Sequence, residues 1–349
     1  MRHCLVSLIS DQTIPNILLI KTLNDVDRHL FVATSRTREG GHLDWVKQFC
    51  DGVPVDALFV VEHDVDSITK ELKAYFSGHQ EYRYTVNITG GTKIMALVTY
   101  GFFQARLARI MYLPPGRNLA LTISPGHRDS IGITFRLSAH EYLSAYGIQI
   151  EESSSLGLSR QLVSKLFQYL TSQKKRGSRL GGAVSDRCRV VLPHPPQELA
   201  DLLEWPMERI LSKEFYRYVS GCWFEEYVGH WISHSIPSAH PMIGVRIRRQ
   251  DVSNELDVLF TIDNCLHVME LKTIRSLKDS HENLYKLDSI SRDFGLYPKC
   301  YLLLSDPLIE KRSEGLPSLK ARAKRLGVDV WTYSDVRPDR IEDTIKERI

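Results

Sequence analysis

The feature that most constrains this chain is a pair of strand-like runs joined by two turn-forming residues. Residues 254–273 read N-E-L-D-V-L-F-T-I-D-N-C-L-H-V-M-E-L-K-T. Asp263-Asn264 suits the two-residue turn of a β-hairpin, because Asp and Asn tolerate the left-handed backbone of such a turn. The flanking runs are rich in Val, Leu, Ile and Phe, as strands are. The sequence therefore predicts a β-hairpin with a fixed register.

That register brings charged side chains together. Asp257 faces Glu270, and Glu255 faces Lys272, across the predicted ladder. Because side chains alternate between the two faces of a strand, all four project from one face. Carboxylates on directly opposed residues, whose Cβ atoms are roughly 4.5–5.5 Å apart, repel each other. The pair Asp257 and Glu270 therefore needs a compensating cation.

A divalent metal ion fits this pair. Carboxylate oxygens suit Mg²⁺ or Mn²⁺, and the peptide carbonyl of Leu271 adds a further oxygen. Lys272 would neutralise charge that develops on a phosphorane-like transition state. The alternative is a partly exposed hairpin with a Glu255–Lys272 salt bridge and two ordinary surface acids. The apolar residues that alternate with the charges favour the metal site, because unpaired charges are costly in a buried sheet.

A helix-like segment upstream, G-C-W-F-E-E-Y-V-G-H-W-I, supplies two more carboxylates beside an apolar stripe. A helix Glu in a G-x-x-F-E context, then a strand Asp, then E-x-K resembles the PD-(D/E)xK restriction-endonuclease-like fold, although no Pro precedes Asp257. The resemblance implies a metal-dependent endonuclease. Its catalytic residues would be Glu225, Asp257, Glu270 and Lys272, and its metal ligands Asp257, Glu270 and the Leu271 carbonyl. Glu226 is the reserve for the helix position, and a solvated surface pair is the alternative for Glu225 and Glu226.

The chain after the hairpin completes this α/β pattern. The segment E-N-L-Y-K-L-D-S-I-S-R-D-F reads as a helix, and a buried strand is expected at 300–304. The helix brings Lys286 toward the predicted site. Lys286 is a candidate for nucleic-acid binding at the scissile phosphate, and equally a surface lysine.

The N-terminal part alternates strand-like and helix-like runs. The strands are expected at 5–9, 30–34, 57–61, 84–88 and 109–113. This alternation is typical of a doubly wound parallel sheet, in which ligands bind at the carboxyl ends of the strands. The residues that follow the strands are therefore the candidates for a binding site.

The segment N-I-T-G-G-T-K-I-M is the strongest of these candidates. A strand leads into Gly90 and Gly91, and a helix is expected to begin near Thr92. Backbone N–H groups at a helix start bind phosphate, and glycine lets a ligand approach the backbone closely. The spacing is not that of a P-loop. A Gly-Gly turn that only links strand to helix is the alternative.

Together, S-D-Q-T-I-P-N after the first strand, T-S after the second and T-G-G-T-K-x-M after the fourth resemble the CARF domain, the Rossmann-like sensor of cyclic oligoadenylates in type III CRISPR defence. The resemblance covers residues 1–145. It implies a homodimer that binds cyclic tetra-adenylate across its two-fold axis. The ligand-binding residues would be Ser10, Gln12, Asn16, Thr34, Gly90, Gly91, Thr92, Lys93 and Met95.

Length and composition agree with several domains. The 349 residues carry a net charge of +3, and 43% are hydrophobic. We expect a CARF domain at 1–145, a small winged-helix-like connector at 146–212 and a nuclease domain at 213–349. The six cysteines form no C-x-x-C pair, and no signal peptide or membrane span is expected, so the cytoplasm is the expected compartment.

The combined expectation is a type III CRISPR accessory nuclease that cyclic tetra-adenylate activates and that cuts DNA, RNA or both with Mn²⁺ or Mg²⁺. Two alternatives remain. One is a CARF-type transcriptional regulator with an inactive nuclease-like domain. The other is a ring nuclease that degrades the cyclic oligoadenylate.

Overall fold

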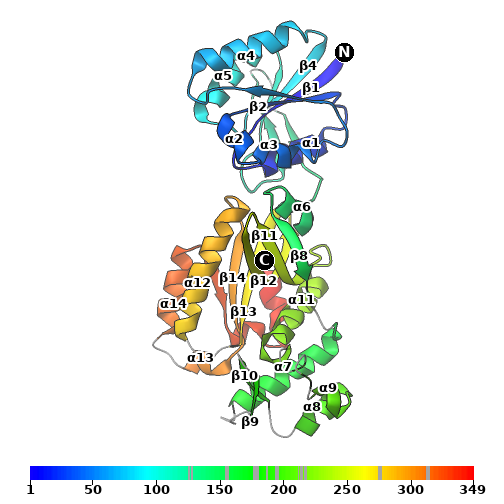
Figure 1. The fold of residues 1–349 in the computed structure, drawn as a ribbon, viewed down its shortest axis with the longest axis vertical. Helices are drawn as coiled ribbons and strands as arrows, with labels where there is room; N and C mark the ends of the chain where they lie inside the picture. The colour runs from blue at the N-terminus through cyan, green and yellow to red at the C-terminus, as the bar shows by residue number, and fades with distance from the viewer. Residues whose placement is uncertain are drawn as a thin grey trace. The chain divides into compact units, whose positions relative to one another are not determined.

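The chain folds into two compact units in a computed structural model (Figure 1). The first unit comprises Met1–Gln149 and Phe294–Tyr297, and the second comprises Ile150–Asp293 and Pro298–Ile349. The structure describes residues 1–349 except 125, 127–128, 154–156, 176–180, 186–187, 193–195, 211, 213–214, 216–217, 274–276 and 312–314. Each unit has its own sheet and is described separately.

The first unit is built on a seven-stranded sheet of order β3-β2-β1-β4-β5-β6-β7. Strands β1 to β5 run parallel, and β6 and β7 complete the sheet as antiparallel strands. The predicted doubly wound sheet is confirmed, and each of its five strands ends one or two residues earlier than predicted. The strands are β1 (Arg2–Leu8), β2 (Arg28–Ala33), β3 (Val55–Phe59), β4 (Tyr82–Asn87), β5 (Arg109–Tyr112), β6 (Leu119–Thr122) and β7 (Ser130–Gly132).

Helices cover both faces of this sheet. Helices α4 and α5 lie on one side, and α1, α2 and α3 lie on the other (Figure 1). Met95 and Phe103 of α5 pack against Val6 and Val32 of the central strands, which excludes water from that face. The helices are α1 (Ile14–Thr22), α2 (Ser35–Glu39), α3 (His42–Lys47), α4 (Val65–Ser77), α5 (Lys93–Gln104) and α6 (Ala139–Ser144).

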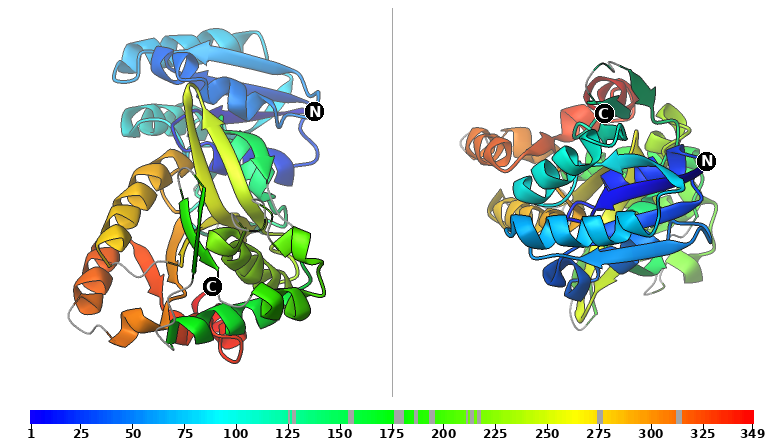
Figure 2. Two further views of the ribbon diagram at one scale, coloured as in Figure 1. Left: turned by 60° about the horizontal axis from the view of Figure 1, so that its bottom comes forward. Right: turned by 90° about the horizontal axis from the view of Figure 1, so that it is seen from above.

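The second unit is built on a six-stranded sheet of order β15-β14-β13-β12-β11-β8. Strands β11, β12 and β13 form an antiparallel meander, whose first hairpin is the long yellow-green pair of Figure 2, and β13, β14 and β15 run parallel. The strands are β8 (Gln149–Ser153), β11 (Met242–Arg249), β12 (Val252–Ile262), β13 (Cys265–Lys272), β14 (Lys299–Leu304) and β15 (Val328–Trp331).

The predicted hairpin is the β12–β13 pair. Asp263 and Asn264 have φ values of 50° and 64°, so both adopt the left-handed backbone of a two-residue turn. The ladder has the predicted register and runs from Ile262↔Cys265 to Val258↔Met269. The strongest sequence feature is therefore confirmed.

Helices pack on this sheet around an aromatic core. Phe167 of α7 stacks on Tyr227 of α11 with ring centroids 4.5 Å apart, and Trp223 and Trp331 are fully buried in the same core. The helices are α7 (Arg160–Lys175), α8 (Pro196–Leu203), α9 (Met207–Ile210), the π-helix η1 (Tyr218–Cys222), α11 (Trp223–Ser235), α12 (Leu277–Ser291), the 3₁₀-helix η2 (Arg292–Phe294), α13 (Pro307–Lys311), α14 (Leu316–Arg325), α15 (Tyr333–Val336) and α16 (Ile341–Arg348).

The region predicted as a connector, 146–212, spans the boundary between the two units. From Ile150 onward it belongs to the second unit, where β8 forms the edge of the six-stranded sheet. It also contains a two-stranded hairpin of β9 (Gly181–Ser185) and β10 (Cys188–Leu192). Residues 154–156, 176–180, 186–187, 193–195 and 211 of the region lie outside the described residues.

Among the helices that the structure describes, none combines the length and the hydrophobicity needed to cross a bilayer.

Candidate active site

The strands of the hairpin stop pairing where the predicted site begins. The backbone ladder ends at the Val258↔Met269 pair. Beyond it, the side chain of Asp257 joins the two strands, because its Oδ2 accepts a hydrogen bond from the Leu271 N–H at 2.6 Å. The predicted Asp257–Glu270 and Glu255–Lys272 cross-strand pairs thus lie beyond the regular ladder, because a carboxylate has replaced a backbone acceptor. This bond holds Asp257 in place on β12.

Asp257, Glu270 and Lys272 form one cluster, as the sequence predicted. The Lys272 Nζ lies 2.7 Å from Glu270 Oε1 and 3.2 Å from Asp257 Oδ2. Glu270 is 2% exposed and Asp257 is 9% exposed. Two buried carboxylates therefore share one ammonium group, and Glu270 and Lys272 are held on β13 by its parallel pairing with β14.

Burial and repulsion from a neighbouring carboxylate make Asp257 reluctant to ionise. Burial raises the pKa of Asp257, and the neighbouring Glu270 carboxylate raises it further, while Lys272 acts in the opposite direction. Burial lowers the pKa of Lys272, but Asp257 and Glu270 more than offset this, so the pKa of Lys272 is raised. Lys272 is therefore a stable cation in the cluster.

Glu225 belongs to this cluster, although it comes from a helix. It lies in the first turn of α11. Burial raises the pKa of Glu225 to about 8, followed by repulsion from Asp257 and Glu255. Glu225 is half-buried, and the acids that act on it are those of the cluster. Glu225 thus lies in the same electrostatic surroundings as Asp257 and Glu255, and its catalytic role stays a prediction.

Glu226 has a different role. It is 1% exposed and accepts hydrogen bonds from the Gly157 N–H at 2.8 Å, the Leu158 N–H at 3.4 Å and the Tyr218 hydroxyl at 2.6 Å. These bonds tie α11 to the chain that precedes α7 and to the π-helix. Because Glu226 is not a solvated group, the alternative of a solvated Glu225–Glu226 surface pair is wrong. The role of Tyr218 was missed in the sequence, because nothing in its spacing marks a bond that depends on the tertiary fold.

Lys286 reaches the cluster from α12. Its Nζ lies 3.2 Å from Glu270 Oε1 and 3.4 Å from Glu270 Oε2, and it donates to the Glu255 carbonyl at 3.4 Å. The Lys286 side chain is 42% exposed. It is thus a second cation at the acidic cluster, with part of its surface open to solvent.

The donor chemistry of the cluster suits a hard cation. Asp257 and Glu270 approach each other closely enough to repel, and carboxylate oxygens are the ligands that Mg²⁺ and Mn²⁺ prefer. Within the described part of the chain, no three or more His, Cys, Asp or Glu side chains are already gathered as a metal site. Lys272 lies between the two carboxylates in this structure.

The residues predicted to bind a nucleotide fall into two groups. The first group forms the framework of the first unit. Asn16 is fully buried, donates to the Leu8 carbonyl at 3.0 Å and accepts from Asn87 at 2.9 Å. Thr34 is 5% exposed and caps α2, and Met95 is fully buried in the core. Their side chains hold the loops in place.

The second group lines the carboxyl ends of the strands. Gly90 is packed so tightly that an added Cβ would lie 2.2 Å from the Leu8 carbonyl oxygen, and Gly91 has a φ of 73°. Thr92 caps α5 by accepting the Met95 N–H at 3.2 Å, and Lys93 is exposed. The predicted strand–glycine–helix arrangement is therefore present, with both glycines required by the backbone.

The loops after β1 and β2 complete this edge. The Ser10 hydroxyl bonds to the backbone N–H and carbonyl of Gln12, both at 3.3 Å. Arg36, in α2, donates to Asp11 at 2.8 Å and has a side chain that is 59% exposed. Ser10 and Gln12 are half-buried. Arg36 lies just after β2, and its pairing with Asp11 in the loop after β1 depends on the tertiary fold.

The chain is thus a two-part α/β protein, with a doubly wound N-terminal unit and a second unit that carries an Asp–Glu–Lys cluster. Two family models match the chain in these same two regions. The Card1 CARF domain matches residues 4–142, and the Card1-like endonuclease domain matches residues 212–332. The chain thus joins a CARF domain of the Card1 type to a Card1-like endonuclease domain.

Solved structures share this fold. Can2 from Sulfobacillus thermosulfidooxidans, in complex with cyclic tetra-adenylate, is 22% identical with a TM-score of 0.76, and the match covers 98% of each chain. Protein VC1899 from Vibrio cholerae is 18% identical with a TM-score of 0.75, over 98% of this chain and 97% of that one. A type III CRISPR defence DNA nuclease activated by cyclic oligoadenylate is 17% identical with a TM-score of 0.56, over 87% of this chain and 45% of that one. No curated protein sequence matches the chain.

Proposed function

We propose that this chain is a type III CRISPR accessory nuclease that cyclic tetra-adenylate switches on, and that it hydrolyses phosphodiester bonds in DNA or RNA with a divalent metal ion. The observation that carries the proposal is the convergence of Glu225, Asp257, Glu270 and Lys272 from a helix and two strands. The Card1-type domains and the fold shared with Can2 support it. The order of the four residues also supports assignment to the PD-(D/E)xK superfamily.

Asp257 and Glu270 would hold the metal ion, together with the Leu271 carbonyl. A bound Mg²⁺ or Mn²⁺ supplies Lewis acidity and lowers the pKa of water. Asp257 is kept in position by the Leu271 N–H, and Glu270 by the pairing of β13 with β14. With a pKa of about 8, Glu225 favours its protonated form at neutral pH, and a bound cation would lower this pKa.

Lys272 and Lys286 would act on the phosphate. Lys272 is held as a cation by the two carboxylates and would stabilise negative charge on the transition state. Lys286 combines contact with Glu270 and partial exposure, so it would bind the nucleic-acid backbone as substrate arrives.

The nucleotide would bind at the carboxyl ends of the first unit's strands. Gly90 and Gly91 allow close approach to the backbone, and Lys93 and Arg36 add positive charge at the same edge. Ser10 and Gln12 would supply side-chain hydrogen bonds. Asn16, Thr34 and Met95 would not contact the nucleotide and would instead hold the loops of the binding site in position.

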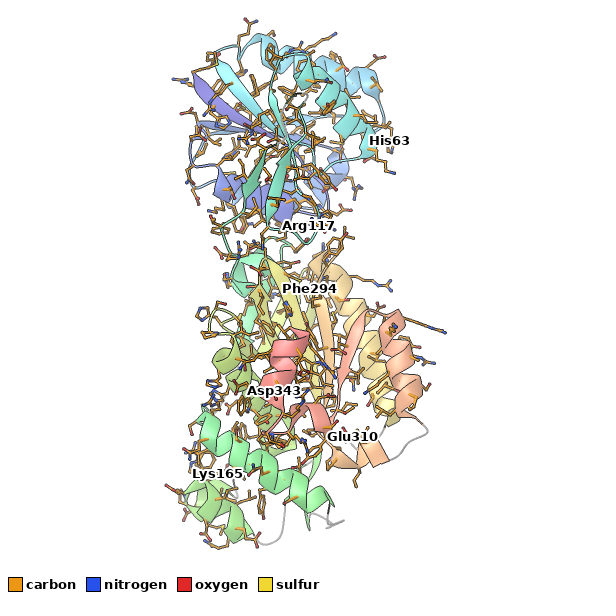
Figure 3. All side chains as sticks on the ribbon, turned by 180° about the vertical axis from the view of Figure 1, so that it is seen from behind. His63, Arg117, Lys165, Phe294, Glu310 and Asp343 are labelled. Carbon is orange, nitrogen blue, oxygen red and sulfur yellow. The ribbon has the colours of Figure 1, made fainter. Side chains whose placement is uncertain are left out.

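A second copy of the chain would complete the sensor. Several large apolar side chains of the first unit are exposed, including Val61 (61%), Val65 (52%) and Leu97 (68%). The Thr92 hydroxyl donates to the Glu62 carbonyl at 2.9 Å, which brings the loop after β3 against the start of α5. His63 extends from this loop (Figure 3). An apolar patch of this kind fits the two-fold contact of a homodimer.

A cleavage panel with the full-length protein tests the proposal. Single-stranded DNA, duplex DNA and RNA are each incubated with Mn²⁺ or Mg²⁺, with and without cyclic tetra-adenylate. Cutting is expected only when both metal and nucleotide are present. Asp257→Asn and Glu270→Gln are each expected to lower the rate by roughly 10²–10³ while nucleotide binding is retained.

Glu282→Gln is the matched control, because Glu282 is an exposed carboxylate on the same helix as Lys286. Equal cutting without nucleotide would contradict the switch. Sequence-specific duplex binding without cleavage would favour a transcriptional regulator, and loss of cyclic tetra-adenylate without nucleic-acid cleavage would favour a ring nuclease.

A further inference from the structure

A four-residue segment that follows α12 folds as part of the first unit. Phe294–Tyr297 is grouped with Met1–Gln149, and the Phe294 side chain is fully buried (labelled in Figure 3). The Tyr142 hydroxyl donates to the Phe294 carbonyl at 3.0 Å. The Leu296 N–H donates to Gln12 Oε1 at 3.1 Å. The segment is therefore anchored at Phe294 and at Leu296 by side chains of the first unit.

Gly295 fits this anchor without room for a side chain. Its φ is 86°, and an added Cβ would lie 2.2 Å from the Tyr146 hydroxyl oxygen and 3.0 Å from Gln12 Oε1. Tyr146 also donates to Gln12 Oε1, at 3.2 Å. Both the left-handed backbone and the close approach require glycine. The segment thus packs closely against Tyr146 and Gln12 at a position where only glycine fits.

Gln12 connects this anchor with the edge where the nucleotide is proposed to bind. Its carboxamide oxygen serves the segment, and its backbone is bonded on both sides to the Ser10 hydroxyl. Ser10 and Gln12 lie in the loop directly after β1. A nucleotide that forms hydrogen bonds to Ser10 and to the Gln12 side chain would replace the bond between Gln12 and the Leu296 N–H. The nucleotide and the segment would therefore compete for the Gln12 side chain.

Both flanks of the segment lead to the catalytic cluster. The preceding helix, α12, carries Lys286, which contacts Glu270. The strand that follows, β14, pairs with β13 through Glu270↔Leu302 and Lys272↔Leu304. A change in the position of Phe294–Tyr297 therefore acts by covalent continuity on two elements that hold the catalytic side chains.

We propose that Gln12 couples nucleotide binding to catalysis by releasing Phe294–Tyr297 from the first unit. The coupling rests on the proposed function, because the nucleotide is taken to be a cyclic oligoadenylate bound beside Ser10. With the segment anchored, the cluster is restrained. With Gln12 engaged by the nucleotide, the segment is free to move and the cluster can adopt its active arrangement.

Hydrogen exchange on the full-length protein tests the release directly. Addition of cyclic tetra-adenylate is expected to speed amide exchange at Leu296 by about tenfold, since its acceptor on Gln12 is withdrawn. Unchanged or slower exchange at Leu296 in a protein that binds the nucleotide would overturn the proposal.

Substitutions in the anchor provide the second test. Gly295→Ala is expected to break the anchor and so raise cleavage without nucleotide, and to tighten nucleotide binding by about fivefold, the equivalent of one hydrogen bond. Tyr142→Phe is a milder variant with the same expected direction. Gly52→Ala is the matched control, because Gly52 has a φ of 81° but no atom within 4 Å of an added Cβ.

The outcomes separate the two proposals. Absence of cyclic tetra-adenylate binding by the unmodified protein would overturn the proposed function. In that case, only the cleavage rates of the variants in the absence of nucleotide test the coupling. If Gly295→Ala and Tyr142→Phe both cut at the rate of Gly52→Ala, the coupling is wrong whatever the nucleotide does.

Discussion

The adjacent residues Glu225 and Glu226 are expected to respond in opposite ways to the same substitution. Burial and the nearby acids raise the pKa of Glu225 from 4.5 to about 8. Each pKa unit corresponds to about 1.4 kcal/mol, so ionising Glu225 in the folded, metal-free protein costs at most about 5 kcal/mol. Glu226 is stabilised by three hydrogen bonds instead.

The sign follows from proton binding. Between pH 4.5 and about pH 8 the folded protein keeps the Glu225 proton, whereas the unfolded chain loses it. Stability from this group is therefore fully present below pH 4.5 and is lost as the pH rises through about 8. Glu225→Gln removes the ionisable group, and with it this loss of stability at high pH. The variant should match the unmodified protein at about pH 5 and exceed it by about 2–5 kcal/mol at about pH 9.

Glu226→Gln is expected to destabilise the protein by about 1–3 kcal/mol at both pH values, because a side-chain amide group would then face buried N–H donors. The assay is urea unfolding in a chelator, followed by tryptophan fluorescence. Four of the five tryptophans lie in the second unit, so this signal reports the unit that contains both residues. The reasoning would be refuted if the free energies of unfolding of Glu225→Gln and of the unmodified protein differed by the same amount at about pH 5 and at about pH 9.

Three further substitutions have defined outcomes. Lys286→Gln should lower the cleavage rate about tenfold to a hundredfold with little change in melting temperature, whereas Glu282→Gln should leave the rate unchanged. If the two variants cut at the same rate, Lys286 does not belong to the site. Gly90→Ala should abolish nucleotide binding in titration calorimetry, since its Cβ would meet the backbone of β1 at 2.2 Å, whereas Gly132→Ala, with open space around its Cβ, should bind normally. Leu97→Asp should halve the molar mass seen by light scattering if α5 lies in the dimer contact, and an unchanged mass would place that contact elsewhere.

Much of the hairpin was predictable from local rules. The residue types at Asp263 and Asn264 specify a two-residue turn, and the two-residue period of a strand then assigns each side chain to a face. The same period identifies Asp257, Glu270 and Lys272 as neighbours. Only the detail at Asp257 escaped, because a side chain that replaces a backbone acceptor leaves no trace in the pattern.

The glycines of the T-G-G-T-K segment were predictable for a similar reason. A strand that ends at paired glycines before a helix forces tight backbone geometry, and Gly90 and Gly91 both show it. The burial of Asn16 and Met95 was not predictable from the motif. A motif records which residues recur around a ligand and does not separate those that touch it from those that hold the loops.

The sequence by itself determined the two sheets, the hairpin register and the residues available for chemistry, since these depend on local turn geometry and on the alternation of polar and apolar side chains. The tertiary structure gave Glu225 and Glu226 different surroundings, because their one-residue separation turns them in different directions on α11. It also decided that Phe294–Tyr297 belongs with Gln12. Such a contact joins residues almost 300 positions apart, and no local preference of the chain encodes it.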